Sequence, residues 1–416
     1  MRKLIVSAVV LIAALAFTVS GALGGADQAP GVTAKSITIG GTFPLTGPAA
    51  AYAPIGSGIR TYFSFINSRK GPDKKRGIGG RQVVFKIYDD GYNPANTVQL
   101  TRKLVEEDKV FAIVGQLGTE PVLAARPYLN QAKVPQSLVS TGASYWGLQY
   151  KEFPWTIGFQ QDYIAEARLY GKHIRANQAG KKIAVLYQND DYGKDYLYGL
   201  RAALGKSYAD ANIVAEVPFE VTAPSLASQM ARIKASGAAI FVIFGTPLPT
   251  IRAYATGKAL AYNPDQIYLN SVAATAAFLN VAVQSAGAAY VNGSLSVTAF
   301  KDPSNPAQAG DAGVQEYKRI MAKYAPSLNA NNQLYMYGFA LAEGFVQAMY
   351  KAGKNPTRAS YMNALLSLNS SNRFLLNGVK MKTSRTDHFV VSQMRLQRFN
   401  NGVWTPVGQL VEGRPR

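Results

Sequence analysis

The sequence predicts an α/β fold in which helices cover both faces of parallel sheets. Strand-like and helix-like segments alternate from Lys35 to about Gly293, a pattern typical of parallel sheets. The chain has 416 residues. About 390 of them would remain without the N-terminal leader described below, which is too many for one hydrophobic core. We therefore expect two domains of ordinary size.

The segment from residue 79 to residue 115 is the clearest example of this alternation. A β-branched run ends at Asp89-Asp90, and a second such run extends from Val110 to Val114. Apolar residues recur at helical spacing between the two runs. These residues are Val98, Leu100, Leu104 and Val105. The segment is therefore predicted to be a strand, a helix and a second, parallel strand.

The later elements continue the alternation and then change character. Strands are predicted over residues 183–187, 213–219 and 239–244, and helices over 194–204 and 226–235. Two further predicted helices, 311–325 and 333–351, are rich in aromatic residues. The last predicted strand, 389–399, is followed by Asn400-Asn401-Gly402 and the segment around Trp404. Because Asn and Gly readily adopt the positive φ angles of a tight turn, this sequence predicts a hairpin.

The N-terminus has the pattern of a secretory signal peptide. Met1-Arg2-Lys3 precede an apolar run from Leu4 to Val19, and small residues follow as far as Ala26. The run is shorter than the roughly 20 apolar residues that a membrane span needs. We therefore expect residues 1–26 to be a signal peptide of a protein exported to the periplasm. Cleavage after Ala22 and cleavage after Ala26 both fit the small residues.

Composition excludes several classes of function. The chain has no cysteine, so the sequence predicts no disulfide, no thiolate metal site and no lipidated cysteine. The formal net charge is +20, but the lysines and arginines are scattered, and the longest cluster, Lys74-Lys75-Arg76, lies in a predicted turn. We expect a solvated loop there and no nucleic-acid partner. The charge indicates solubility and a mild bias toward anionic solutes.

The sequence carries no recognisable catalytic motif. A nucleophile elbow, a phosphate-binding P-loop and a dinucleotide-binding glycine motif are all missing. His173 and His388 are the only histidines; we expect His173 on a solvated helix face and His388 in a structural role. We therefore predict no catalytic residue, no cofactor and no metal site. A hydrolase with an unrecognised site remains the alternative from another functional class.

The ordered motifs resemble those of periplasmic branched-chain amino acid receptors, the type I solute-binding proteins that serve ABC importers. The main resemblance lies in residues 79–115, and shorter matches follow in the same order along nearly the whole chain. These matches are Ile37-Thr38-Ile39-Gly40, Pro44-Leu45-Thr46-Gly47, Ile66-Asn67, Val134-Pro135, Asp190-Asp191-Tyr192-Gly193 and Asn400-Asn401-Gly402-Val403-Trp404. The resemblance implies a small-molecule ligand and a permease partner in the inner membrane.

The resemblance also implies two lobes, each a parallel sheet covered by helices, with a hinged cleft between them. Each lobe would be discontinuous in sequence, because the chain crosses between them three times. We place lobe 1 at residues 35–157 plus 296–373, and lobe 2 at residues 158–295 plus 374–416. We expect the protein to be a monomer.

Ligands of open parallel sheets bind at the carboxyl ends of strands, and the family's ligand-binding positions fall in such loops here. The positions that bind a ligand carboxylate match Thr119, Gly142 and Ser144, and the aromatic positions match Tyr52 and Tyr192. Hydroxyls and free N–H groups at helix starts can bind a carboxylate. The alternative roles are helix capping for Thr119 and Ser144 and lobe packing for the tyrosines. With their neighbours, the candidate ligand-binding residues are Tyr52, Gln116, Leu117, Thr119, Gly142, Ala143, Ser144, Tyr145, Tyr192, Thr246, Pro247, Asn270 and Val272.

One position departs from the family pattern. Amino-acid-binding members carry an acidic residue that pairs with the ligand ammonium, and the matching residue here is Val272. No Asp or Glu occurs between Asp265 and Asp302. Because burying an unpaired ammonium is costly, we expect an amine-free aromatic or aliphatic carboxylic acid as ligand. Binding of a branched-chain amino acid, a short amide or urea, and a sensor of the same fold are the alternatives.

Overall fold

The computed structural model describes residues 29–414. The predicted signal peptide, with both candidate cleavage sites, lies outside the described residues. Among the helices of residues 29–414, none is both long and apolar enough to span a lipid bilayer.

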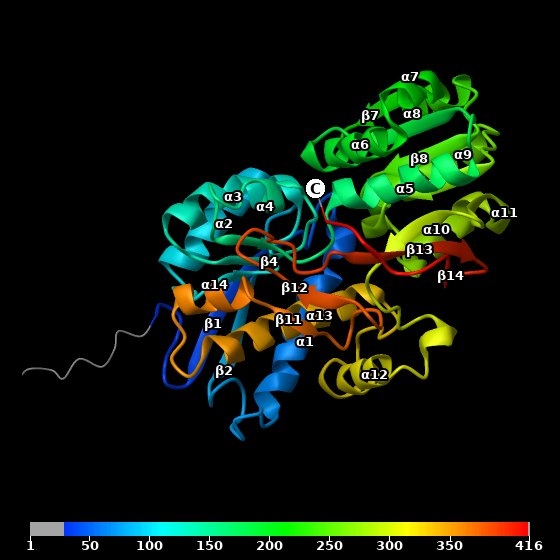
Figure 1. Cartoon of the computed structure of the whole chain (residues 1–416). Helices are drawn as coiled ribbons and strands as arrows, with labels where there is room; N and C mark the ends of the chain where they lie inside the picture. The colour runs from blue at the N-terminus through cyan, green and yellow to red at the C-terminus, as the bar shows by residue number, and fades with distance from the viewer. Residues whose placement is uncertain (1–28, 415–416) are drawn as a thin grey trace, which may run out of the picture.

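The first sheet has five parallel strands in the order β2-β1-β3-β4-β5. The strands are β1 (Ser36–Phe43), β2 (Gln82–Asp89), β3 (Ile113–Val114), β4 (Gln136–Val139) and β5 (Thr156–Gly158). Four helices connect or follow them: α1 (Pro54–Ser68), α2 (Pro94–Glu106), α3 (Thr119–Gln131) and α4 (Tyr145–Leu148). Three helices from later in the chain lie with this sheet: α12 (Ala312–Tyr324), α13 (Gln333–Ala352) and α14 (Arg358–Leu365) (Figure 1). A short helix, η1 (Ala50–Tyr52), precedes α1, and η3 (Pro306–Gln308) precedes α12.

The second sheet has the strand order β14-β13-β10-β9-β8-β6-β7, with β15 also pairing with β13. Its parallel strands are β6 (Ile183–Gln188), β7 (Ile213–Phe219), β8 (Ile240–Phe244), β9 (Gln266–Leu269) and β10 (Leu295–Thr298). The antiparallel strands are β13 (Gln393–Asn400), β14 (Val403–Pro406) and β15 (Val411–Glu412). The helices are α5 (Tyr163–Asn177), α6 (Asp191–Leu204), α7 (Lys206–Asn212), α8 (Ala227–Ala235), α9 (Pro247–Ala259), α10 (Ala276–Ala286), α11 (Ala288–Val291) and the short η2 (Ser271–Ala273).

The predicted hairpin at the end of the chain is present. Asn401 and Gly402 form a two-residue loop in which both φ angles are positive, +50° and +84°. Asn400 pairs with Val403 on either side of this loop. Positive φ at both loop positions gives the turn a twist that matches the twist of the two strands.

The packing indicates different positions for two of the predicted points at which the chain crosses between lobes. β10 pairs with β9 and β13, so residues 296–298 belong to the second sheet rather than to lobe 1. Phe374, Met381 and Val391 are buried in the core of the first sheet, so most of residues 374–391 belong there rather than to lobe 2. We therefore propose that the chain crosses after β5, after β10 and just before β13. Within the reassigned segment, β12 (Lys380–Lys382) forms a two-stranded ribbon with β11 (Asn369–Ser371), which precedes the segment.

The first core depends on a close approach of two helices that are distant in sequence. α1 and α13 pack through Gly58 and Gly338. A Cβ atom on Gly58 would lie 2.3 Å from the carbonyl oxygen of Tyr335, and one on Gly338 would lie 2.4 Å from that of Ile55. Because both glycines lack a side chain, the two backbones can approach this closely.

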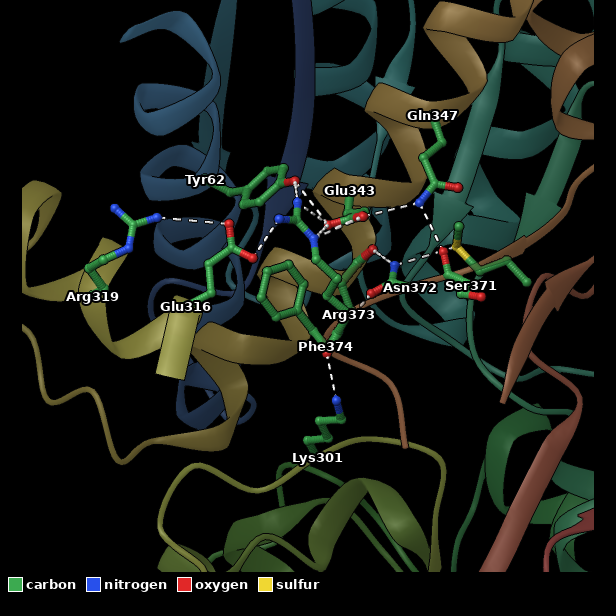
Figure 2. A network of polar contacts seen from close by, with 12 residues as sticks. Tyr62, Lys301, Glu316, Arg319, Glu343, Gln347, Ser371, Asn372, Arg373 and Phe374 are labelled. Atoms are coloured by element: carbon green, nitrogen blue, oxygen red, sulfur yellow. Dashed lines mark hydrogen bonds and ion pairs between the residues drawn. The ribbon is translucent and has the colours of Figure 1, made fainter. Parts of the chain in front are cut away.

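A polar network around Arg373 ties the same helices together (Figure 2). Its guanidinium donates to the carboxylate of Glu343 on α13 at 2.8 Å and to that of Glu316 on α12 at 2.5 Å. It also donates to the hydroxyl of Tyr62 on α1 at 2.9 Å, and that hydroxyl donates to Glu343 at 3.0 Å. Arg373, which follows β11, thus contacts three helices at once.

We predict that Arg373→Met lowers the free energy of unfolding by about 2–3 kcal/mol, because it leaves the carboxylate of Glu343 without its charged partner. The side chain of Glu343 is only 10% exposed. Arg319→Met is the matched control, since its pair with Glu316 is long, 3.8 Å, and the side chain of Arg319 is 62% exposed. It should cost no more than about 0.5 kcal/mol. Urea denaturation of both variants measures the difference, and equal losses would contradict the role given to Arg373.

Candidate ligand-binding site

A cavity lies where the carboxyl ends of the two sheets meet. Leu117, Thr119 and Ser140 approach it from loops of the first sheet, and Thr246 and Val272 approach it from the second. Its volume is about 80 Å³ in this conformation. A cavity of roughly 150 Å³ holds one benzene molecule. The two sides must therefore separate somewhat before a ring-sized ligand can enter.

Five tyrosines contribute much of the wall. They are Tyr52, Tyr92, Tyr163, Tyr192 and Tyr337. The hydroxyl of Tyr337 donates to Oε1 of Gln160 at 2.8 Å, and that of Tyr52 donates across the cavity to the carbonyl oxygen of Val272 at 3.2 Å. Burial raises the pKa of all five hydroxyls. Each tyrosine therefore stays neutral and offers apolar area with one polar end.

The described residues that line the cavity include no Asp, Glu, Lys, Arg or His. The polar lining consists of hydroxyls and of the amides of Gln160, Gln161, Gln333 and Gln397. A charged group on a ligand would therefore find neutral hydrogen-bonding partners and no counter-charge within the wall. Such a site favours ligands whose surface is mainly apolar.

Helix α3 begins at the cavity with Thr119. Gly118 precedes it with φ +97°, a conformation that turns the chain sharply into the helix. The hydroxyl of Thr119 lies 2.7 Å from that of Thr141, and either hydroxyl can be the donor. When Thr141 donates, the proton of Thr119 is free for a ligand. The first N–H groups of α3 add the partial positive charge of a helix start.

A buried carboxylate stands behind the wall of the second side. Glu166 on α5 accepts hydrogen bonds from the backbone N–H and the hydroxyl of Ser271 at 2.7 and 2.6 Å. It also accepts from the hydroxyl of Tyr170 at 2.8 Å and from Nε2 of Gln161 at 3.2 Å. Burial raises the pKa of Glu166, and these hydrogen bonds oppose the rise. Glu166 thus fixes two wall residues, Ser271 and Gln161, without reaching the cavity itself.

Ser144 does not take the predicted place in the cavity. Its backbone N–H and its hydroxyl donate to the two carboxylate oxygens of Asp195 on α6, at 2.7 and 2.8 Å. The hydroxyl of the next residue, Tyr145, donates to Asp191 at 3.0 Å. Ser144 is predicted to bind the carboxylate of a ligand, whereas here its donors are occupied by a carboxylate of the protein itself. The two residues join the first side of the molecule to the second instead of lining the site.

The neighbouring predicted residues Gly142 and Ala143 also lie outside the lining. The carbonyl oxygen of Gly142 accepts the N–H of Tyr163 at 2.8 Å. A Cβ atom on Gly142 would lie only 2.1 Å from the carbonyl oxygen of Gln161. The glycine is thus occupied by the segment that leads into α5. Ala143 is completely buried against Trp146 and its neighbours.

Three other predicted residues support the site from behind. Nε2 of Gln116 donates to Thr42 and Thr101, so its amide is held in the core of the first sheet. Asn270 donates to the hydroxyl of Tyr192 at 2.7 Å and thereby positions that ring. Pro247 is the first residue of α9 and is buried outside the lining. Tyr52, Leu117, Thr119, Tyr192, Thr246 and Val272 are the predicted residues that the structure brings together around the cavity.

Several wall residues were missed from the sequence. Tyr92 follows the end of β2, and Gln160 and Gln161 follow the end of β5. The strand-end rule used for the other loops would have found these three. Tyr337 lies inside helix α13, where nothing in its spacing separates it from a core residue.

The two histidines are placed by neighbouring groups. His173 is half-buried, and its Nδ1 lies 2.8 Å from the hydroxyl of Tyr268, so the prediction of a solvated position is wrong. Burial lowers the pKa of His173. His388 is buried, and its Nδ1 donates to the carbonyl oxygen of Thr156 at 2.9 Å. Within residues 29–414, no cluster of three or more His, Asp or Glu side chains is arranged to hold a metal ion.

Comparison with known proteins places the chain among binding proteins. A sequence model described as periplasmic binding protein matches residues 36–403. The Leu/Ile/Val-binding protein homolog 3 of Brucella melitensis is 27% identical over 214 residues, which cover 50% of this chain and 54% of that protein. The chain thus spans about half the length of the curated relatives it matches.

Two solved structures share the fold. A branched-chain amino acid ABC transporter protein from Thermus thermophilus, with bound valine, has a TM-score of 0.78 at 18% identity, and the match covers 92% of this chain and 97% of that one. A solute-binding protein of an ABC transporter from R. palustris, in complex with 4-hydroxybenzoate, has a TM-score of 0.74 at 17% identity, with 92% and 98% covered. The same fold therefore accompanies ligands with and without an amine.

We predict that Asp162, which caps α5 beside the cavity, makes the protein less stable as the pH rises. One carboxylate oxygen accepts the N–H of Ala165 at 2.7 Å, and the other is buried without a partner among the described residues. Burial, and then the charge of Asp195, raise the pKa of Asp162 from 3.8 to about 7. The folded state therefore holds this proton more tightly than the unfolded state, and the resulting stability is lost between about pH 4 and pH 7.

The variant Asp162→Asn keeps the cap and removes the titration. Relative to the wild type, it should gain up to a few kcal/mol between pH 4.5 and pH 8, measured by urea denaturation. Asp311→Asn is the control with the opposite sign. Burial would raise the pKa of Asp311, but the hydrogen bonds from Lys301 and from the backbone N–H of Val314, together with the charge of Lys301, outweigh burial and lower it. This variant should therefore lose stability mainly at the higher pH. A pH-independent difference for Asp162→Asn would contradict the assignment.

Proposed function

Because the chain belongs to the periplasmic binding protein family, we propose that it is an extracytoplasmic receptor that encloses a small molecule and delivers it to an ABC importer. Hinge closure around a ligand is general in such proteins. A ligand that touches both sides of the cavity favours the closed arrangement by its differential affinity. The permease in the inner membrane would recognise that arrangement. We propose that the receptor acts in the periplasm, as a monomer, and that it does not turn over its ligand.

We propose an amine-free aromatic or aliphatic carboxylic acid as the ligand. The observation that carries this proposal is the cavity wall, in which tyrosines predominate and the described residues carry no charge. An α-ammonium group would be buried there without an acidic partner, at a high cost. A carboxylate is better served, because the hydroxyl of Thr119 and the start of α3 supply donors. The R. palustris protein with bound 4-hydroxybenzoate gives a precedent on this fold.

A branched-chain amino acid is the second candidate. The Brucella relative is named for leucine, isoleucine and valine, and the Thermus structure holds valine. One observation counts against this candidate: Val272 lies in the cavity wall, at the position where the family pattern has an acidic residue. The ammonium would then depend on neutral oxygen atoms alone. Short amides and urea, and a sensor with the same cavity, are the remaining alternatives.

We predict that aromatic and aliphatic monocarboxylates raise the melting temperature of the ligand-stripped protein, whereas leucine and valine at equal concentration do not. Binding to the folded state alone stabilises it by mass action. Differential scanning fluorimetry against matched pairs, such as 4-methylpentanoate and leucine, measures the effect of the amine. Stabilisation by leucine alone would overturn the assignment of the acid. Chromatography of the incubated compounds would reveal any turnover.

We predict that Thr119→Val weakens a bound acid by about 1.5–3 kcal/mol, because a hydrogen bond to a charged group is lost. Thr298→Val is the matched control. Thr298 also lines the cavity, but its hydroxyl is committed to the backbone of Phe300, donating at 3.1 Å and accepting at 3.0 Å. The control should change the affinity by less than about 0.5 kcal/mol. Isothermal titration calorimetry decides, and similar losses in both variants would argue against Thr119 as a carboxylate donor.

A further inference from the structure

Two buried polar atoms of cavity-lining residues have no partner among residues 29–414: Oγ of Ser140 and Oε1 of Gln161. The amide oxygen of Gln161 can only accept a hydrogen bond. Gln161 lines the cavity and is only 1% exposed. Its Nε2 donates to Glu166 at 3.2 Å and to the hydroxyl of Ser271 at 3.0 Å. Among residues 29–414, nothing hydrogen-bonds to its Oε1. A buried polar atom that is left unpaired is unusual, because it loses water and gains nothing in return.

The neighbours of Gln161 determine which end of its amide is free. If the amide were reversed, Oε1 would face the carboxylate of Glu166, and two acceptors would oppose each other. The hydroxyl of Ser271 cannot relieve this contact, because it already donates to Glu166 at 2.6 Å. The amide nitrogen is therefore held on the side of Glu166. The oxygen is therefore the end of this amide that has no partner among the described residues.

The adjacent residue, Gln160, shows the contrasting case. It also lines the cavity and is buried. Its Oε1 accepts from the hydroxyl of Tyr337 at 2.8 Å, and its Nε2 donates to the hydroxyl of Tyr163 at 3.1 Å. Both ends of this amide are thus occupied by the wall itself. Of the two glutamines, only Gln161 has an unused hydrogen-bonding atom.

We infer that Gln161 is a specificity-determining residue whose Oε1 accepts a hydrogen bond from a hydroxyl or an amide N–H of the bound molecule. The inference rests on the proposed function, since it names a second chemical feature of the same ligand. The donor is uncharged, because the described wall carries no acidic side chain to pair with an ammonium. Glu166 acts as a positioning residue that holds the amide in the required orientation.

A molecule without a donor fills the cavity but leaves Oε1 unpaired. We expect it to bind at least about tenfold more weakly than its hydroxylated counterpart. Suitable acid pairs are 4-hydroxyphenylacetate with 4-methoxyphenylacetate, and 2-hydroxy-4-methylpentanoate with 4-methylpentanoate. Phenol with anisole, and benzamide with N,N-dimethylbenzamide, are pairs that carry no carboxylate.

Calorimetry on the ligand-stripped full chain tests the inference with three proteins. In the wild type, the donor-bearing member of at least one pair should bind at least about tenfold more tightly. In Gln161→Met, which keeps the length of the side chain, the ratio should fall to near one. In the control Gln160→Met the preference for the donor should persist, although both members bind more weakly. A wild-type ratio near one, an unchanged ratio in Gln161→Met, or no binding of any donor-bearing probe would overturn the inference.

The two sets of probes separate this inference from the proposed function. If phenol and benzamide show the preference and the acids do not bind, the acid assignment fails and the role of Gln161 stands. If the acids bind but no pair shows the preference, the acid assignment stands and the role of Gln161 fails. Glu166→Gln provides a second variant should Gln161→Met fold poorly. It lets the amide of Gln161 rotate, so the affinity for the methoxy compound should rise relative to that for the hydroxy compound. An unchanged ratio of the two affinities would count against the inference.

Discussion

The hydrogen bonds from Ser144 to Asp195 hold the carboxyl-terminal edges of the two sheets against each other, and the cavity depends on this contact. Asp195 gives up water when it is buried, and burial raises its pKa to about 6. In place of water, its two carboxylate oxygens accept hydrogen bonds from the N–H and the hydroxyl of Ser144 across the interface. The carboxylate of Glu120, in the first turn of α3, accepts the N–H of Asp191 close by. The interface is therefore polar, whereas the cavity beside it is rich in tyrosine.

Within residues 29–414, charged side chains lie behind the residues that line the cavity and not among them. Glu166 on α5 and Asp162, the N-cap of α5, lie behind the wall, and they accept hydrogen bonds from backbone N–H groups and from neutral side chains. The wall thereby gains fixed geometry without gaining a charge. Rigid neutral groups of this kind select a ligand by shape and by the match of donors and acceptors.

The sequence allowed most of the fold to be predicted, because parallel strands are buried on both faces and produce continuous apolar runs. The strand predicted over 213–219 coincides with β7, and the hairpin is present. The run from Val110 to Val114 is longer than β3, because the chain reaches regular pairing only at Ile113. In the site, strand-end position located Thr119, Thr246 and Val272. It failed for Ser144, since no pattern within one loop reveals that a carboxylate from another helix will occupy its donors.

The long sequence separation between elements that pack together has a consequence for how the molecule forms. α1 cannot complete its packing until α13 is available, about 280 residues later, and β10 cannot pair with β13 until the end of the chain is present. Contacts between residues so far apart in sequence slow folding, because long loops must close before the contacts can form. The core of the first sheet is therefore complete only after α13 has been added. While it is being synthesised, the chain presents unfinished apolar surfaces of the kind that chaperones recognise.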